Sequence, residues 1–301
     1  MKSDVFYWVL NLSLHGSLVC LLLLLLRRVR RLPRRAVYPL WIGAALRLTV
    51  PFAPAVPWSF LHLLKQLGAR TVRPPSDWFD RFAAVNAFQA ADSYFPVVYR
   101  TDVLKTLFET CALIWMIGAA ACLLTMTALY AMSRMALRGA KALAPGVWCS
   151  DKVVSPGLFG IVRPKILVPP GTEGKLLDYV VRHEQVHRRR LDNLWRIAAL
   201  TICCLHWFNP LIWLSLKAFF ADMELSCDEA VLRTLPDGAR KEYALSLLSV
   251  AKGQDLFVSA FGGATLRLRV ERVLSYRRLS LAAGIVCSML VGALLATLAF
   301  G

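Results

Sequence analysis

Cysteine is absent from residues 57–103, although the sequence contains eight cysteines elsewhere. A disulfide framework in that stretch is therefore excluded. Adjacent Cys203 and Cys204 have the spacing of neither a zinc ribbon nor a redox motif, so we expect two small buried residues there. The sequence also lacks internal repeats and low-complexity linkers, which argues against a repeat array.

Acidic residues are scarce, with 19 Asp and Glu against 36 Lys and Arg and a formal net charge of +17. Such an excess is compatible with nucleic-acid binding. Contact of cytoplasmic segments with anionic lipid headgroups, however, explains much of it in a chain with long apolar runs. Direct binding of nucleic acid is therefore not expected.

Long apolar runs dominate the composition. The hydrophobic fraction of 57% and the mean hydropathy of +0.52 lie outside the usual range of globular domains. A membrane-spanning helix needs about 20 mostly apolar residues, and four stretches meet that requirement, at residues 5–26, 36–56, 104–130 and 280–301. The first lacks a small-residue cleavage site, so we expect a retained anchor. The predicted fold class is a mainly α integral membrane protein with four transmembrane helices.

Basic residues set the orientation of these spans. The link between the first two contains Arg27, Arg28, Arg30, Arg31, Arg34 and Arg35 and no acidic residue. The positive-inside rule places this link in the cytoplasm. We therefore expect a multi-pass protein of the inner or plasma membrane with both termini outside, an external loop at 57–103 and a cytoplasmic domain at 131–279.

The first part of the cytoplasmic domain has the punctuation of a small β structure. Gly and Pro residues separate short β-rich runs at 147–150, 158–162 and 165–168, which predicts a small hairpin or sheet.

Two helical runs follow, at 176–206 and 211–235, separated by the breaker Trp207-Phe208-Asn209-Pro210. They predict a helical hairpin whose apolar tip touches or partly enters the cytoplasmic leaflet. Two further full spans are the less favoured alternative, because Arg196, His206, Asn209 and Lys217 would then need partners inside the bilayer.

The run His183-Glu184-Gln185-Val186-His187 predicts a metal site. Two His residues four apart lie on one face of a helix about one turn apart, where both imidazoles can bind the same zinc ion. Glu184 lies about 100° around the helix from His183, so it can reach a water on the metal without being a ligand itself. This pattern predicts Glu184 as the catalytic base.

Three carboxylates compete for the third ligand position: Glu224, Asp228 and Glu229. A helix rises about 1.5 Å per residue. By this measure Asp228 lies at about the same distance from the turn between the two predicted helices as His187 does, which favours Asp228 as the ligand. Glu224 and Asp228 share a helix face, however, so one can bind zinc while the other orients a ligand His. Glu229 points elsewhere and is expected to be a surface or helix-stabilising residue, and Cys227 a packing residue.

The sequence resembles the BlaR/MecR-type sensor-transducer metallopeptidases, the integral membrane zinc peptidases of bacterial β-lactam signalling. The resemblance covers nearly the whole chain. It rests on the four-span layout and on five motifs, Ser155-Pro156-Gly157-Leu158-Phe159-Gly160, Arg163-Pro164-Lys165-Ile166-Leu167-Val168-Pro169, the His183–His187 motif, His206-Trp207-Phe208-Asn209-Pro210 and Glu224-Leu225-Ser226-Cys227-Asp228-Glu229-Ala230.

This resemblance implies a gluzincin-like zinc endopeptidase that cleaves a cytoplasmic protein, typically a winged-helix transcriptional repressor, and often itself, in the segment before the last span (257–278). The Glu-x-x-x-Asp spacing is also similar to that of membrane CAAX-prenyl endopeptidases, which implies Glu224 as the zinc ligand and Asp228 as the support of a ligand. β-Lactam receptors of the family continue into an external penicillin-binding domain. This chain stops at Gly301, so we expect either a fragment or a member that senses another signal.

Several alternatives stay open at this point. Substrate is expected to add as a strand near residues 158–168, and His206 is either an oxyanion donor or, preferably, a structural residue at the turn. The rival functions are a non-proteolytic transducer or scaffold with a structural zinc site, and an intramembrane or quality-control protease. A homodimer is left open.

Overall fold

The computed structural model describes residues 2–29, 32–50, 102–161, 163–251 and 266–276, together with positions 289 and 293. The predicted external loop and fourth span lie almost entirely outside these residues. So does the first part of the predicted self-cleavage segment, before residue 266.

Two described segments are long and apolar enough to cross a membrane: Val5–Leu26, within α1 (Lys2–Leu26), and Thr106–Gly139, which contains most of α7 (Asp102–Ala136). The first coincides with the first predicted span, and the second overlaps the third predicted span, 104–130, and extends beyond it. The described part of the second predicted span is helical through α2 (Arg34–Val37), η1 (Tyr38–Leu40) and α3 (Trp41–Thr49). It is shorter than the roughly 20 residues that a bilayer requires, so the four-span layout remains a prediction.

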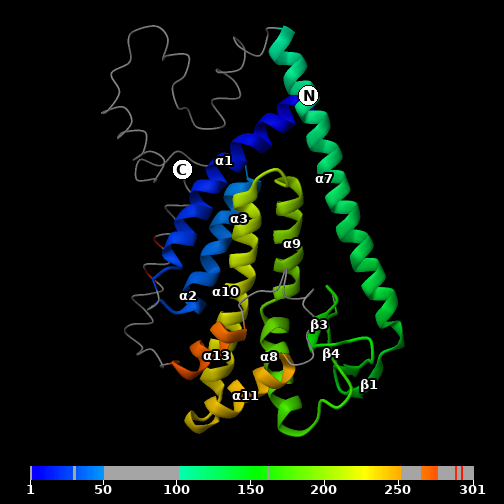
Figure 1. The fold of residues 1–301 in the computed structure, drawn as a ribbon, viewed down its shortest axis with the longest axis vertical. Coiled ribbons are helices and arrows are strands. Elements are labelled where there is room, and N and C mark those ends of the chain that lie inside the picture. The colour runs from blue at the N-terminus through cyan, green and yellow to red at the C-terminus, as the bar shows by residue number, and fades with distance from the viewer. Residues whose placement is uncertain are drawn as a thin grey trace.

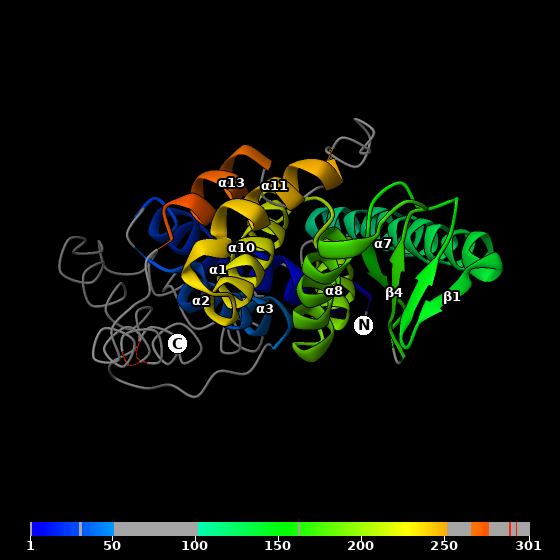
Figure 2. The same cartoon turned by 90° about the horizontal axis from the view of Figure 1, so that it is seen from below.

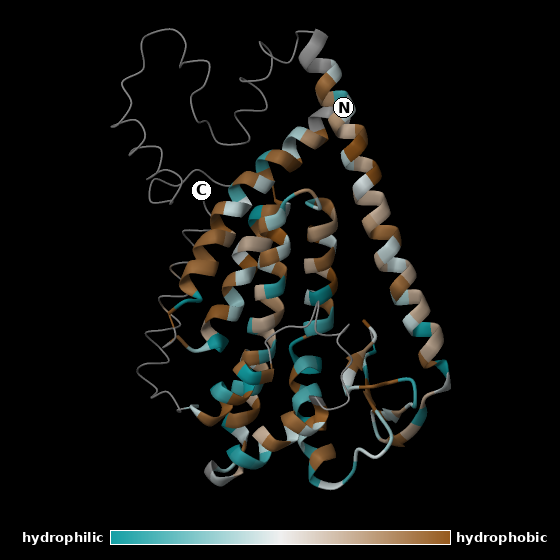
Figure 3. Ribbon diagram, in the orientation of Figure 1, coloured by the Kyte–Doolittle hydropathy of each residue, from teal (hydrophilic) through white to brown (hydrophobic). Residues whose placement is uncertain are grey.

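Four helices form a bundle at one end of the molecule (Figure 1). The helices α9 (Asp192–Leu205) and α10 (Pro210–Thr234) run beside α1 and α3, and α7 leans away from them toward the sheet. Figure 3 shows mostly hydrophobic ribbon in this region and hydrophilic segments at the opposite end. The core of the bundle consists of buried apolar residues: Val19, Cys20, Leu23, Leu40, Trp41, Ala44, Leu48, Cys203, Ile212, Leu216, Ala218, Phe219 and Met223. Buried Cys203 and Cys204 agree with the expectation from their spacing.

The turn between α9 and α10 lies inside this bundle. His206 Nε2 lies 3.0 Å from the Leu48 carbonyl, and Asn209 donates hydrogen bonds to Ser13 and Ser17 on α1 at 2.7 and 2.8 Å. These are the partners that the polar residues of the hairpin tip need in apolar surroundings. His206 thus holds the turn, and its contacts support the structural role and not that of an oxyanion donor.

The predicted helix over 176–206 is wrong in one respect, because the structure divides it into α8 (Gly174–Arg189) and α9. Leu191 between them has a φ of 57°, a left-handed conformation that costs a non-glycine residue about 1–2 kcal/mol. No Gly or Pro marks the break. Its consequence is that Asp192 turns back toward the end of α8.

A four-stranded sheet lies beside α8, with the order β1-β2-β4-β3 (Figure 2). The strands are β1 (Lys141–Ala144), β2 (Val147–Cys149), β3 (Gly157–Phe159) and β4 (Lys165–Val168). β2 and β4 are parallel, and the other two pairs are antiparallel. The sequence predicted the bounds of β4 without error and those of β2 and β3 within three residues. It missed β1, an exposed edge strand with the composition Lys-Ala-Leu-Ala.

Two further helices cover the end of α10 that is remote from the turn. These are α11 (Arg240–Ala251), which follows η3 (Asp237–Ala239), and α13 (Leu266–Leu274). Their shared core consists of Val231, Leu232, Leu235, Tyr243, Ala244, Leu247 and Val273. This packing brings Tyr243 and Arg269 to the two predicted metal-binding histidines.

Candidate metal centre

The helix α8 places His183 and His187 on one buried face, one turn apart. Their side chains are 10% and 1% exposed. The ring centroids lie 4.8 Å apart at 78°, and the two Nε2 atoms face each other at 3.1 Å.

The outer nitrogens of both rings have polar partners that fix the tautomers. His187 Nδ1 lies 2.6 Å from an Asp192 carboxylate oxygen. His183 Nδ1 lies 3.0 Å from the Tyr243 hydroxyl, which itself donates to Asp228 at 2.8 Å. In both rings Nδ1 is therefore the donor, and the Nε2 lone pairs point at each other. Two facing lone pairs repel each other unless a proton or a cation lies between them, and the Arg269 guanidinium lies 3.4 Å from His183 Nε2.

Glu224 on α10 completes a set of three inward-facing donors. Its carboxylate oxygens lie 3.4 Å from His183 Nε2 and 3.6 Å from His187 Nε2. Ligand atoms about 2.0–2.1 Å from a tetrahedral zinc ion lie roughly 3.4 Å from one another. The three donors fit such an ion, with nitrogen and oxygen atoms of the kinds that zinc prefers.

Two arginines hold the carboxylates in place. Arg196 on α9 donates to Glu224 at 2.7 Å. Arg269 on α13 donates to both oxygens of Asp228 at 2.8 Å, and its guanidinium lies 3.4 Å from Glu224. Asp228 also lies 3.3 Å from His183 Nδ1. A carboxylate at that position orients the ring and makes its other nitrogen a better ligand.

Cys227 gives a second donor set, since His183, His187 and Cys227 offer ligand atoms within 4.8 Å of one another. The thiol, however, lies 3.6 Å from Nδ1 of His183 and 3.4 Å from the His183 carbonyl. One imidazole cannot present both nitrogens to one ion. The Nδ1 atoms are engaged with Asp192 and Tyr243, which favours the set that contains Glu224.

The charges around the site favour a positive charge at the place where the two histidines and Glu224 meet. Burial alone would lower the pKa of His187, but Cys227, Glu224 and the hydrogen bond to Asp192 raise it well above its usual value. Burial alone would raise the pKa of Glu224, but His187, His183 and Arg269 hold it well below its usual range. A cation has the same electrostatic requirement.

Glu184 is buried, with 7% of its surface exposed. It forms no hydrogen bond or ion pair with any residue that the structure describes. Glu184 is next in sequence to His183 on α8, and its carboxylate is not held by a hydrogen bond or ion pair among the described residues.

The structure thus gathers four of the predicted site residues, His183, His187, Glu224 and Asp228, with Glu184 next in sequence to His183; their roles remain predictions. Sequence reasoning missed four others: Asp192, Arg196, Tyr243 and Arg269. Asp192 follows an unmarked break. The other three reach the site because α9, α11 and α13 pack against it, and no local sequence pattern predicts that packing.

Glu229 is partly buried. Its carboxylate accepts hydrogen bonds from the backbone N–H groups of Arg34 at 2.8 Å and Arg35 at 3.1 Å. Burial raises the pKa of Glu229 in spite of these bonds. The residue stabilises a helix, as one of the two expected roles requires, but the helix is α2 and not its own.

Comparisons with known proteins agree with this picture. The chain is 35% identical over 102 residues to the regulatory protein BlaR1 of Bacillus licheniformis, which covers 33% of this chain and 17% of the relative. It is 27% identical over 113 residues to the methicillin resistance mecR1 protein of Staphylococcus aureus and Staphylococcus epidermidis, covering 36% of this chain and 19% of the relative. The matched region is thus less than a fifth of these relatives' length. The family model for the BlaR1 peptidase M56 matches residues 7–272, most of the chain, and the protein belongs to this family.

Proposed function

We propose that this protein is a membrane zinc endopeptidase that cleaves a cytoplasmic protein, a transcriptional repressor or the chain itself, in transmembrane signalling. The observation that carries the proposal is the convergence of His183 Nε2, His187 Nε2 and the Glu224 carboxylate. Glu184, next in sequence to His183, has no hydrogen bond or ion pair with the residues that the structure describes. A structural zinc site needs no free carboxylate next to its ligands and is usually closed by a fourth protein ligand. Glu184 therefore favours a catalytic role over a scaffold.

His183, His187 and Glu224 would hold the metal. A zinc ion supplies polarisation of the scissile carbonyl and lowers the pKa of its bound water to about 7. Glu184 takes the proton of the attacking water as general base and returns a proton to the leaving amine as general acid. Asp192 and Asp228 keep the two imidazoles oriented with Nε2 inward.

The position of the site favours a cytoplasmic substrate over an intramembrane one. Asp222, half a turn before Glu224 on α10, pairs with Arg27 at 2.8 Å, directly after the apolar run of α1 ends. The site is therefore level with the end of this apolar helix, where the basic link begins. The helices α8 and α13 also contain several arginines, and several of these in hydrocarbon would be costly.

The half-buried edge strand β3 is the proposed place for the substrate backbone, because an extended chain can pair with the edge of a sheet. Asn193, next to Asp192, donates through Nδ2 to the carbonyls of Leu158 and Gly160 at 2.9 Å. This side chain ties the strand to the start of α9. A carbonyl has a second lone pair, so these groups can still accept a bond from substrate.

A comparison of new protein N-termini in cells that produce wild type or Glu184→Ala tests the proposal. We expect N-termini in cytoplasmic proteins, or in this chain itself, that depend on Glu184. The control is Glu242→Ala, which removes an exposed carboxylate paired with Lys175 on the surface, and should give the wild-type pattern. Identical patterns in wild type and Glu184→Ala would overturn the proposed function.

A further inference from the structure

Tyr38 connects the basic link after α1 with the metal centre. Its hydroxyl donates a 2.9 Å hydrogen bond to one oxygen of Asp192, whose other oxygen lies 2.6 Å from His187 Nδ1. Asp192 is completely buried, so its carboxylate depends on protein partners and not on bulk water. We propose that Tyr38 is a positioning residue of the metal centre, one that sets the orientation of His187 through Asp192. This inference rests on the proposed function.

The ring of Tyr38 has little freedom. It stacks on Phe219 of α10, with ring centroids 5.6 Å apart at 18°, and the Arg190 guanidinium lies 4.4 Å over the ring. Arg190 also donates to Asp192 at 3.3 Å and to Ser226 of α10 at 3.1 Å. These contacts fix the position of the Tyr38 hydroxyl beside Asp192. The Asp192 carboxylate cannot rotate without losing a hydrogen bond to Tyr38, His187 or Arg190.

The backbone that carries Tyr38 is fixed to the same helix as the third ligand. Glu229 of α10 binds the first two N–H groups of α2. Asp222 of α10 lies 3.4 Å from the Arg34 guanidinium and accepts a 3.0 Å hydrogen bond from the Trp41 indole. Glu224 lies between these two carboxylates in the sequence. The link, the proposed third ligand and the orienting partner of His187 thus form one connected unit.

A packing role and a positioning role for Tyr38 differ in what the hydroxyl does. Tyr38→Phe keeps the stacking on Phe219 and the contact with Arg190 and removes only the bond to Asp192. Loss of a partner that orients a metal ligand typically weakens metal binding by about 10–100-fold. Packing alone predicts no change.

The matched control is Tyr179→Phe. It removes a hydroxyl bond of similar length, 3.0 Å to the exposed Glu242, and keeps the ring. A second variant, Asp192→Asn, isolates the pathway. If Tyr38 acts through Asp192, Tyr38→Phe weakens binding in the wild-type background and has little further effect in Asp192→Asn, since the two residues form one network.

The experiment uses the full chain in detergent, with zinc affinity measured by chelator competition and the visible spectrum of the Co²⁺-loaded protein as a signature of ligand geometry. We expect about 10–100-fold weaker zinc binding and an altered Co²⁺ spectrum in Tyr38→Phe, and neither change in Tyr179→Phe. Unchanged affinity and spectrum in Tyr38→Phe, or an equal loss in both backgrounds, would overturn the inference while leaving a zinc-binding wild type and the proposed function intact. A wild type that binds no zinc would remove both.

Discussion

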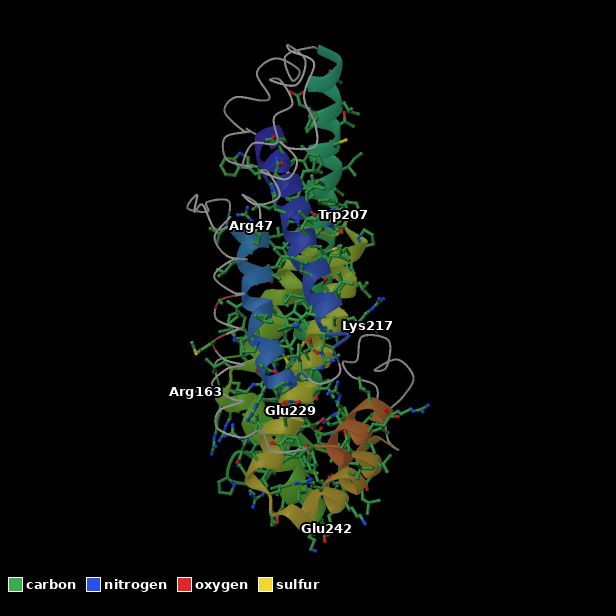
Figure 4. All side chains as sticks on the ribbon, turned by 90° about the vertical axis from the view of Figure 1, so that its left-hand side faces the viewer. Arg47, Arg163, Trp207, Lys217, Glu229 and Glu242 are labelled. Atoms are coloured by element: carbon green, nitrogen blue, oxygen red, sulfur yellow. The ribbon has the colours of Figure 1, made fainter. Side chains whose placement is uncertain are left out.

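Glu229 of α10 accepts a 2.8 Å hydrogen bond from the backbone N–H of Arg34, the first residue of α2. The two residues are 195 positions apart, so this bond joins the link after α1 to the helix that carries Glu224 and Asp228. Figure 4 shows Glu229 within the molecule, between Trp207 in the bundle and Glu242 at the opposite end.

Removing this contact should destabilise the protein. Glu229→Ala leaves two N–H groups at the start of α2 without their acceptor, and an unpaired buried donor costs about 1–3 kcal/mol. Glu242→Ala removes an exposed carboxylate of the same type and should change the free energy of unfolding by less than about 0.5 kcal/mol. Urea unfolding of both variants in detergent measures the difference. Equal stability of the two would show that Glu229 does not fix α2.

Cys227 distinguishes the two donor sets. Its thiol lies on the Nδ1 side of His183, so Cys227→Ser should leave zinc content and affinity unchanged. If the thiol were a ligand in place of Glu224, the serine variant would lose most of its zinc at micromolar concentrations. Metal analysis of the purified variant after dialysis decides between them.

Glu224 and Asp228 should differ in what their removal does. Glu224→Ala deletes a proposed ligand, whereas Asp228→Ala deletes the support of His183, a loss that typically weakens binding by only about 10–100-fold. We expect the larger loss of zinc affinity in Glu224→Ala. A zinc titration that finds tighter binding by Glu224→Ala than by Asp228→Ala would refute the assignment.

Local pattern was enough to predict the pair of histidines, Glu184 and the helix that returns with Glu224 and Asp228. It was not enough to choose between the two carboxylates. The preference for Asp228 came from the distance between His187 and the turn along a straight helix over 176–206. The left-handed conformation of Leu191 divides that helix, so the assumption is wrong. A leucine in this conformation has no signature in the sequence, because leucine does not favour the left-handed region as glycine or asparagine does.

Residues that act at a distance escaped sequence reasoning for a different reason. No local pattern in the sequence marks Arg269 as a site residue, yet its guanidinium binds Asp228 from 41 positions away. Tyr38 was part of a predicted span, and nothing local connects it with Asp192, 154 positions later. Such contacts depend on how helices pack, and a single sequence does not specify that.

The ion pair of Asp228 should make stability depend on pH. Burial alone would raise the pKa of Asp228, but Arg269 and His183 hold it below its usual range. An unfolded aspartate titrates near pH 4, so the unfolded state binds more protons, and the contribution is complete above about pH 4 and is lost as the pH falls further.

Asp228→Asn should therefore be less stable than wild type at about pH 7 and should approach it below about pH 4. Unfolding by urea of the chelator-treated proteins, measured across this range, gives the difference without interference from bound metal. A difference that stays constant or grows toward acid pH would contradict the role of the ionised carboxylate.

The zinc content of the purified full chain tests the central claim most directly. We predict about one zinc per chain for wild type and for Glu184→Ala, because Glu184 acts on water and is not a ligand. The double variant His183→Ala, His187→Ala should contain almost none. Full zinc occupancy in this double variant would contradict the account.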